Sequence, residues 1–209
     1  MDADSWDARY AASDLVWSRE PNAFVAAECA DLSPGRAVDL AAGEGRNAIW
    51  LASLGWQVWA VDYAQVALDK GRRLADTTAL EGRVEWVCAD ATTWRAPEPV
   101  DLVVIAYFQV PAADRRTSVR SAFESLAPGG TLVLVAHDST NLTEGTGGPQ
   151  DPTVLMSADD VLGDLEGLDP EVGRAGRVAR LVTTADEHGG DVSRTAWDCL
   201  VRVRRAASA

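Results

Sequence analysis

One short stretch of the sequence restricts the fold more than any other: an apolar strand that runs into a glycine loop and then into a helix. The strand 36–40 is followed by Ala41-Ala42-Gly43-Glu44-Gly45, and a helical pattern begins at Arg46. Glycines at such a turn let the backbone approach a ligand, and the first helical turn directs free N–H groups toward it. This arrangement is typical of an α/β sheet that binds its ligand at the carboxyl ends of the strands.

The rest of the chain alternates short β-branched runs with helical stretches, which predicts one α/β domain over residues 1–209 with helices on both faces of the sheet. The last two strands are joined by a turn too short for a helical crossover, so we expect an antiparallel hairpin at the end of a mostly parallel sheet. The predicted strands are 36–40, 57–62, 84–88, 100–106, 131–137, 178–184 and 195–203. The predicted helices are 21–32, 46–54, 63–75, 112–126 and 157–165.

Composition excludes several classes of function. The 19 basic and 32 acidic residues give a net charge of −13, which disfavours binding to a nucleic-acid backbone. The sequence holds no apolar run long enough for a membrane span, and its acidic, polar start does not resemble a secretory signal. The three cysteines form no CxxC pair, and two histidines are too few for a His-rich metal site. We therefore expect a cytoplasmic protein without metal.

Three acidic residues accompany the predicted crevice. Residues 43–48 formally satisfy the dinucleotide fingerprint G-x-G-x-x-A, which keeps an NAD(P)-dependent oxidoreductase open as an alternative. However, Asp39 inside the first strand would repel a pyrophosphate and suits an amino group. Asp62, at the end of the second strand, suits a ribose diol, and Asp90 suits an adenine amine. Together they favour a cationic ligand without phosphate, such as S-adenosylmethionine (SAM).

Four motifs occur in an order that resembles the class I SAM-dependent methyltransferases. They are Asp39-Leu40-Ala41-Ala42-Gly43-Glu44-Gly45, Val61-Asp62, Ala89-Asp90-Ala91 and Leu126-Ala127-Pro128-Gly129-Gly130-Thr131-Leu132. The resemblance implies a Rossmann-like, seven-stranded sheet with a reversed last strand, SAM as cofactor and S-adenosylhomocysteine (SAH) as product. The chain departs from the family at Ala41, where the family most often has glycine.

The N-terminal segment, residues 1–32, narrows the resemblance to the tellurite-resistance and thiopurine methyltransferases. In such proteins this segment covers the cofactor, which implies contacts from Trp6, Tyr10 and Trp17. The alternative is that these aromatic side chains only anchor an amphipathic helix. The full set of predicted cofactor-binding residues is Trp6, Tyr10, Trp17, Asp39, Ala41, Gly43, Gly45, Arg46, Asp62, Tyr63, Asp90, Ala91 and Ala106.

The acceptor side of the crevice is expected to follow the fourth and fifth strands. His137 is a candidate general base and Tyr107 a candidate orienting residue, although His137 is equally explained as a strand-end residue bonded to a loop. The polar segment 138–156 is the expected substrate-side loop and carries no basic residue, so we expect a small-molecule acceptor. The prediction is direct SN2 methyl transfer to a thiol, chalcogen oxyanion or similar nucleophile, by a monomer or homodimer. A non-catalytic SAM-binding or SAM-sensing protein remains the other alternative.

Overall fold

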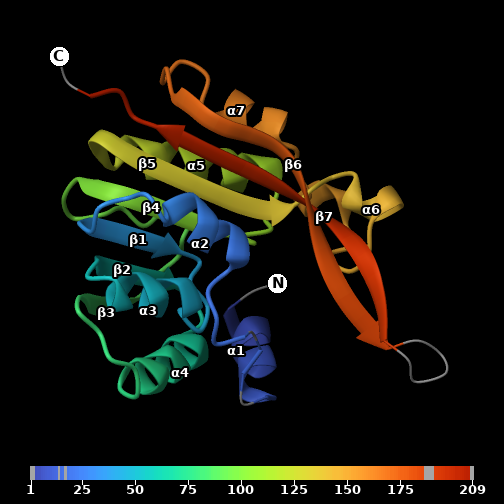
Figure 1. The fold of residues 1–209 in the computed structure, drawn as a ribbon, viewed down its shortest axis with the longest axis horizontal. Coiled ribbons are helices and arrows are strands. Elements are labelled where there is room, and N and C mark those ends of the chain that lie inside the picture. The colour runs from blue at the N-terminus through green and yellow to red at the C-terminus, as the bar shows by residue number, and fades with distance from the viewer. Residues whose placement is uncertain (1–2, 14, 17, 186–190, 208–209) are drawn as a thin grey trace.

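The computed structural model describes residues 3–13, 15–16, 18–185 and 191–207, and its centre is one seven-stranded sheet in the order β3-β2-β1-β4-β5-β7-β6 (Figure 1). The strands are β1 (Arg36–Leu40), β2 (Gln57–Asp62), β3 (Arg83–Cys88), β4 (Val100–Ala106), β5 (Leu126–His137), β6 (Glu171–Ala185) and β7 (Asp191–Arg204). Strands β1 to β5 pair in parallel, and β7 runs antiparallel to both β5 and β6. The predicted mostly parallel sheet with an antiparallel C-terminal hairpin is confirmed.

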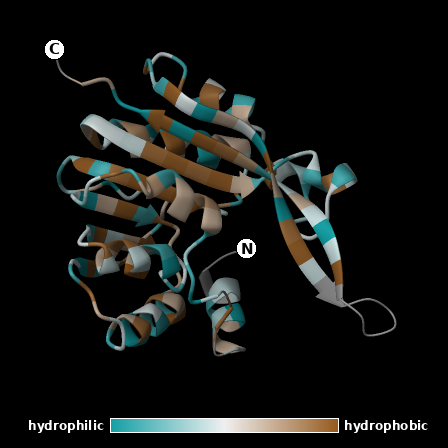
Figure 2. Cartoon of the chain, viewed as in Figure 1, coloured by the Kyte–Doolittle hydropathy of each residue, from teal (hydrophilic) through white to brown (hydrophobic). Residues whose placement is uncertain are grey.

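Helices cover both faces of the sheet. They are α1 (Ala3–Ala11), α2 (Ala23–Cys29), α3 (Arg46–Ser53), α4 (Gln65–Ala75), α5 (Ala112–Glu124), α6 (Asn141–Glu144) and α7 (Ala158–Asp164). Val25 of α2 and Leu51 of α3 belong to the buried cluster on one face, whereas Phe123 of α5 and Val161 of α7 belong to the cluster on the other. The central strands β4 and β5 are correspondingly apolar over most of their length (Figure 2). None of the described helices is long and apolar enough to cross a membrane.

Three strands are clearly longer than their sequences predict, and one of them is β7, which begins at Asp191 rather than at 195. The sixth strand begins at Glu171 rather than at 178. It lies at the edge of the sheet and is largely exposed before residue 178, so no alternation of buried side chains marks this part of the strand. The fifth strand begins at Leu126 rather than at 131, and passes through the predicted turn Pro128-Gly129-Gly130 with a shift of register against β4.

Segment 138–156 is more ordered than a long loop. It contains α6 and a short 3-10 helix (Pro152–Val154), and Asp138 forms an isolated bridge to Met156. The Asp138 carboxylate is buried and accepts hydrogen bonds from the amide and hydroxyl of Thr140. The segment is therefore held at both ends beside β5.

The hairpin of β6 and β7 extends beyond the rest of the sheet (Figure 1). Residues 198–204 of β7 pair with β5, but residues 191–197 pair only with β6. We call this outer part, residues 179–185 and 191–197, the hairpin arm. The arm starts next to Asp198, the first residue of β7 that pairs with β5, at the point where β5 ends in His137.

Candidate active site

The glycine loop between β1 and α3 has three residues in the left-handed region: Ala41 (φ 59°), Gly43 (57°) and Gly45 (73°). Glycine adopts this conformation without strain, whereas a residue with a Cβ atom pays a steric penalty. The chain thus has glycine at two of the three positions and alanine at the third. Ala41, the position where the chain departs from the family, is therefore a point of backbone strain.

Gly45 is required for a reason other than ligand approach. A Cβ atom at Gly45 would lie 2.5 Å from the ring of Trp86 on β3, and one at Gly71 of α4 would lie 2.4 Å from the same ring. Trp86 therefore packs against two glycines. Gly45 is needed in the loop because a larger residue there would clash with this ring.

Asp62 joins the end of β2 to the glycine loop. Its Oδ2 atom accepts a 2.8 Å hydrogen bond from the Gly43 amide, and its Oδ1 atom accepts one of 2.8 Å from the Ala64 amide. The residue is only 8% exposed. Burial raises the pKa of Asp62, and the hydrogen bonds from Ala64 and Gly43 oppose that shift. The carboxylate is thus held rigidly at the carboxyl edge of the sheet.

Asp39 faces α3. Its Oδ2 atom accepts a 3.0 Å hydrogen bond from the amide of Ala48, in the first turn of that helix. Burial raises the pKa of Asp39 to about 7, against the lowering effects of the Ala48 amide, the Arg46 charge and the Asn47 side chain. In this structure Asp39 therefore accepts a hydrogen bond from one of the free amides at the start of α3.

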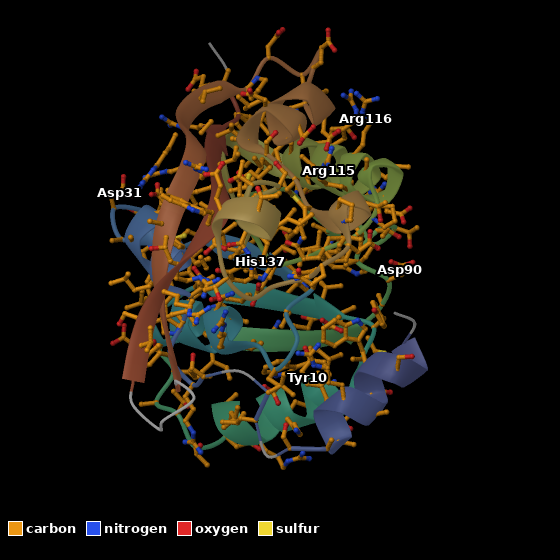
Figure 3. The ribbon with its side chains drawn as sticks, turned by 90° about the vertical axis from the view of Figure 1, so that its right-hand side faces the viewer. Tyr10, Asp31, Asp90, Arg115, Arg116 and His137 are labelled. Atoms are coloured by element: carbon orange, nitrogen blue, oxygen red, sulfur yellow. The ribbon has the colours of Figure 1, made fainter. Side chains whose placement is uncertain are left out.

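Asp90 lies on the same side of the molecule as His137 (Figure 3), at the end of β3. It is exposed, and its Oδ1 atom accepts hydrogen bonds from the amide and hydroxyl of Thr92 at 2.8 and 2.7 Å. The carboxylate thus stabilises the turn that follows β3, as Asp side chains commonly do. Of the other predicted contacts, Ala91 is buried, while Tyr63 and Ala106 are half-buried at the ends of β2 and β4.

Helix α1 packs on α4 beside Asp62. Trp6 and Tyr10 stack with ring centroids 5.6 Å apart, and the buried Tyr10 contacts the cluster of Ala64 and Ala67. The Asp7 carboxylate accepts a 2.9 Å hydrogen bond from the amide of Val66, at the start of α4. These contacts anchor the helix, as the packing alternative predicts. Trp17 lies outside the described residues.

Glu44, inside the glycine loop, holds the N-terminal segment. It is 2% exposed, and both its carboxylate oxygens accept from the amide of Val16, at 3.0 and 3.2 Å. Lys70 of α4 lies 3.4 Å from Glu44 and also donates to the carbonyls of Tyr10 and Ser13. Arg46 contacts the same segment through Ser18, at 3.3 Å. The loop and the N-terminal segment are therefore one hydrogen-bonded unit, which sequence spacing did not reveal.

The two predicted catalytic residues lie side by side. The rings of Tyr107 and His137 are 4.8 Å apart and inclined at 45°. Tyr107 follows β4 in the left-handed region (φ 57°), a strained conformation that is concentrated at functional sites. His137 occupies the middle of the carboxyl edge of the sheet (Figure 3). Its Nδ1 atom lies 3.4 Å from Oδ1 of Asp198.

Asp198 and Arg180 complete this group and were missed by sequence reasoning. Asp198 is fully buried and its Oδ2 atom accepts hydrogen bonds from the Tyr107 hydroxyl at 2.9 Å and from Arg180 Nε at 2.7 Å. It lies directly opposite His137 on β5 and Val178 on β6. The only signal was an acid inside the otherwise apolar run 196–201. We call Tyr107, His137, Arg180 and Asp198 the Asp198 cluster.

The charges of the cluster are well defined. Burial acts to raise the pKa of Asp198, but the nearby His137 imidazole and the hydrogen bonds from Arg180 and Tyr107 outweigh it and lower that pKa. Burial, together with the negative charge of Asp198, raises the pKa of Tyr107 to about 12. At neutral pH the cluster therefore holds a carboxylate, a guanidinium and a protonated phenol.

Basic residues near the site are paired. Arg177 lies 4.0 Å from the centroid of the Trp197 ring and bonds to Glu144 at 2.6 Å. Arg115 of α5 is buried and bonds to Asp164 of α7 at 2.6 Å.

Residues 37–130 match the family model described as "Methyltransferase domain". A tRNA 5-carboxymethoxyuridine methyltransferase of Escherichia coli K12 is 27% identical over 109 residues, covering 51% of this chain and 42% of that protein. A trans-aconitate 2-methyltransferase of Streptomyces avermitilis is 33% identical over 137 residues, covering 62% and 50%. The chain spans about half the length of the curated relatives it matches.

Solved structures share the fold. TehB from Haemophilus influenzae superposes with a TM-score of 0.72 at 18% identity, covering 88% of this chain and 62% of that one. The N-methyltransferase NodS from Bradyrhizobium japonicum, in complex with SAH, gives 0.66 at 20% identity, covering 97% of each chain. Together with the family match, they confirm the predicted Rossmann-like fold of the class I SAM-dependent methyltransferases, and TehB agrees with the predicted tellurite-resistance resemblance.

Proposed function

We propose that this chain, a class I SAM-dependent methyltransferase by its domain and fold, transfers the methyl group of SAM to a small-molecule acceptor. The observation that carries the proposal is the rigid junction between Asp62 and the glycine loop, where Gly43 and Ala64 hold the carboxylate at the carboxyl edge of the sheet. A carboxylate in that position suits the diol of a ribose.

The residues around the junction fit SAM better than a dinucleotide. Asp62 and Asp90 place carboxylates at the ends of neighbouring strands, which suits a hydroxyl-rich, amine-bearing ligand and opposes a pyrophosphate. We assign Asp62 to the ribose, Asp90 and Ala91 to the adenine, and Ala41, Gly43 and Ala106 to backbone contacts with the methionine portion. Trp6, Tyr10, Tyr63 and Arg46 would enclose the ligand, and Asp39 and Gly45 would maintain the loop.

The bound cofactor supplies an activated methyl group, so the protein has mainly to orient the acceptor and exclude water. In the proposed SN2 transfer, Tyr107 lines the acceptor side. We propose a thiol, a chalcogen oxyanion or a similar group as acceptor, because the ionised forms of such groups are strong nucleophiles.

The charge of the site supports a small acceptor over a nucleic acid, even though one curated relative acts on tRNA. Arg177 and Arg180, the arginines nearest the acceptor side on β6, bond to Glu144 and Asp198. Paired arginines in a chain of net charge −13 do not form a phosphate-binding surface.

Calorimetric titration with SAH tests the proposal, with NADH as a parallel ligand. We expect SAH to bind, NADH not to bind, and Asp62→Ala to weaken SAH binding at least about tenfold, or 1.4 kcal/mol. Asp69→Ala is the matched control, because this aspartate lies on the exposed side of α4 in an ion pair with Arg72. Unchanged SAH affinity in Asp62→Ala, or binding of NADH in place of SAH, would overturn the proposal.

A further inference from the structure

The imidazole of His137 has one buried and unsatisfied nitrogen. Its Nδ1 atom is inaccessible to solvent and makes no hydrogen bond of acceptable geometry within the described part of the chain. The nearest anionic group is the Asp198 carboxylate, whose Oδ1 atom is 3.4 Å away. Catalytic hydrogen bonds are often this long without substrate and tighten in the reactive complex. Nδ1 is thus placed to donate to Asp198.

The other nitrogen of the ring lies on the open side. The side chain of His137 is 16% exposed, and of its two ring nitrogens only Nδ1 is both buried and without a hydrogen-bond partner in the described chain, so Nε2, which also has no partner there, is open to solvent. The ring cannot turn freely, since Tyr107 contacts it at 4.8 Å and a Cβ atom at Gly148 would lie 3.0 Å from it. The packing therefore fixes which nitrogen faces the protein and which faces the crevice.

The rest of the cluster is unsuited to exchanging protons at neutral pH. The pKa of Asp198 is lowered and that of Tyr107 is raised to about 12, so one stays ionised and the other stays protonated. Arg180 stays charged, and its pKa is raised because hydrogen bonding to Asp198 outweighs the effect of burial. Imidazole is the side chain that changes charge in the neutral range. His137 is the group of the cluster with the chemistry of a general base.

We propose that Asp198 is a positioning residue that holds His137 as the Nδ1–H tautomer, so that Nε2 is the general base for a protic acceptor. The inference rests on the proposed methyl transfer. The acceptor X–H bond breaks and its proton moves to Nε2. The electron pair on X forms the new X–CH₃ bond while the C–S bond breaks and leaves its electrons on the sulfonium sulfur. The imidazolium that forms is stabilised by the Asp198 carboxylate, and then releases its proton to water.

This assignment narrows the acceptor class. A chalcogen oxyanion has no proton to give, so a dedicated base would be idle, whereas a thiol, phenol or alcohol requires proton removal. Among the described residues, three charged or titratable groups surround the His137 ring: Asp198 from β7, Tyr107 after β4 and Arg180 from β6. The Arg180 guanidinium lies 5.6 Å from the centroid of the Tyr107 ring. The acceptor we assign is therefore a protic group, with the thiol as the member shared with the proposed function.

The tautomer of His137 can be read directly from imidazole ¹⁵N chemical shifts. The chain has two histidines, so a His188→Gln background leaves one imidazole to observe. With ¹⁵N-histidine labelling at a pH where the ring is neutral, we expect the protonated-nitrogen shift at Nδ1 and the unprotonated shift at Nε2. Asp198→Asn should abolish this preference. Glu144→Gln is the matched control, because it also removes a carboxylate paired with a β6 arginine and should leave the shifts unchanged.

The outcomes separate this inference from the proposed function. A neutral His137 in the Nε2–H form, or a preference that persists in Asp198→Asn, would overturn the inference even if SAH binds. Failure of the same labelled protein to bind SAH would overturn the proposed function. If Asp198→Asn does not fold, the wild-type tautomer decides, and Tyr107→Phe serves as the second variant, because removing a donor to Asp198 should shorten the Nδ1–Asp198 contact and strengthen the Nδ1–H preference.

Discussion

The Tyr107 hydroxyl donates a 2.9 Å hydrogen bond to Oδ2 of Asp198, 91 residues further along the chain. Through this bond the loop after β4 is tied to the last strand of the sheet. The bond also supports a buried negative charge, so its loss has consequences for stability that depend on pH.

We expect Tyr107→Phe to lower the free energy of unfolding by about 1–3 kcal/mol at pH 7, because a buried carboxylate loses a donor. The pKa of Asp198 is lowered in the fold, so its stabilising effect is present above the unfolded value and is lost as the pH falls through the folded value. The difference between the variant and the wild type should therefore shrink below about pH 4. Urea unfolding at both pH values checks this. An equal loss at both would point to packing instead.

Ala41→Gly should stabilise the protein. Relief of the left-handed alanine, at φ 59°, is worth about 1–2 kcal/mol, from which the greater flexibility of glycine in the unfolded chain subtracts about 0.4–1 kcal/mol. We expect a net gain of about 0.5–1 kcal/mol in chemical denaturation. Ala42→Gly is the control, because Ala42 is not among the residues with positive φ and should only lose stability. Destabilisation by both substitutions would contradict the strain at Ala41.

The buried Asp39 carboxyl should make the stability of the protein depend on pH. Burial raises its pKa to about 7, so its contribution to stability is full below the unfolded pKa, falls as the pH rises, and is lost above about 7. Asp39→Asn keeps one acceptor for the Ala48 amide without the charge. The stability of the wild type relative to this variant should fall between pH 5 and pH 8, by about 1 kcal/mol or more. Denaturant melts of both proteins measure the difference, and a constant difference would show that Asp39 is ionised throughout.

The buried ion pair between Arg115 and Asp164 is expected to be sensitive to the loss of one partner. Arg115→Met should destabilise the fold by about 3–5 kcal/mol, because it leaves a buried carboxylate without its main partner. Arg116→Ala, which removes a 58% exposed arginine 3.5 Å from the same carboxylate, should cost less than about 1 kcal/mol. Thermal or urea unfolding compares the two, and similar losses would refute the distinction.

Glu44 links the glycine loop to the N-terminal segment, so Glu44→Gln should loosen that segment. We expect trypsin to cleave at Arg9 or Arg19 several-fold faster in the variant, with little change in the core, because cleavage follows local opening. Glu85→Gln is the control, since Glu85 is exposed on β3 and pairs with Arg83. Equal cleavage rates in the two variants would show that other contacts hold the segment.

The features that sequence reasoning anticipated are local ones. The glycine loop is followed by a helix, and an acid stands at the end of the next strand, about twenty residues later. Short-range geometry brings the loop and the acid together, as the hydrogen bond from Gly43 to Asp62 shows. The fold class followed from the same regularity. Parallel strands buried on both faces leave apolar runs that are easily recognised in sequence.

The features that sequence reasoning did not anticipate depend on the register between strands. Asp198 meets His137 because of one particular antiparallel pairing of β7 with β5, and a shift of one residue would place the carboxylate on the opposite face. Arg180 depends in turn on the pairing of β6 with β7. Glu44 lies between two glycines and carries no signal in the sequence, because its partners Val16 and Lys70 are brought to it only by the fold.

The position of β7 between β5 and β6 has a consequence for the biogenesis of the protein. Synthesis proceeds from the N-terminus, so the glycine loop and Asp62 leave the ribosome long before Asp198 does. Until β7 pairs with it, β5 is an apolar sheet edge of the kind that promotes aggregation. The same strand that shields this edge also brings Asp198 to His137. A nascent chain therefore gains its protection from aggregation and the complete Asp198 cluster in a single event.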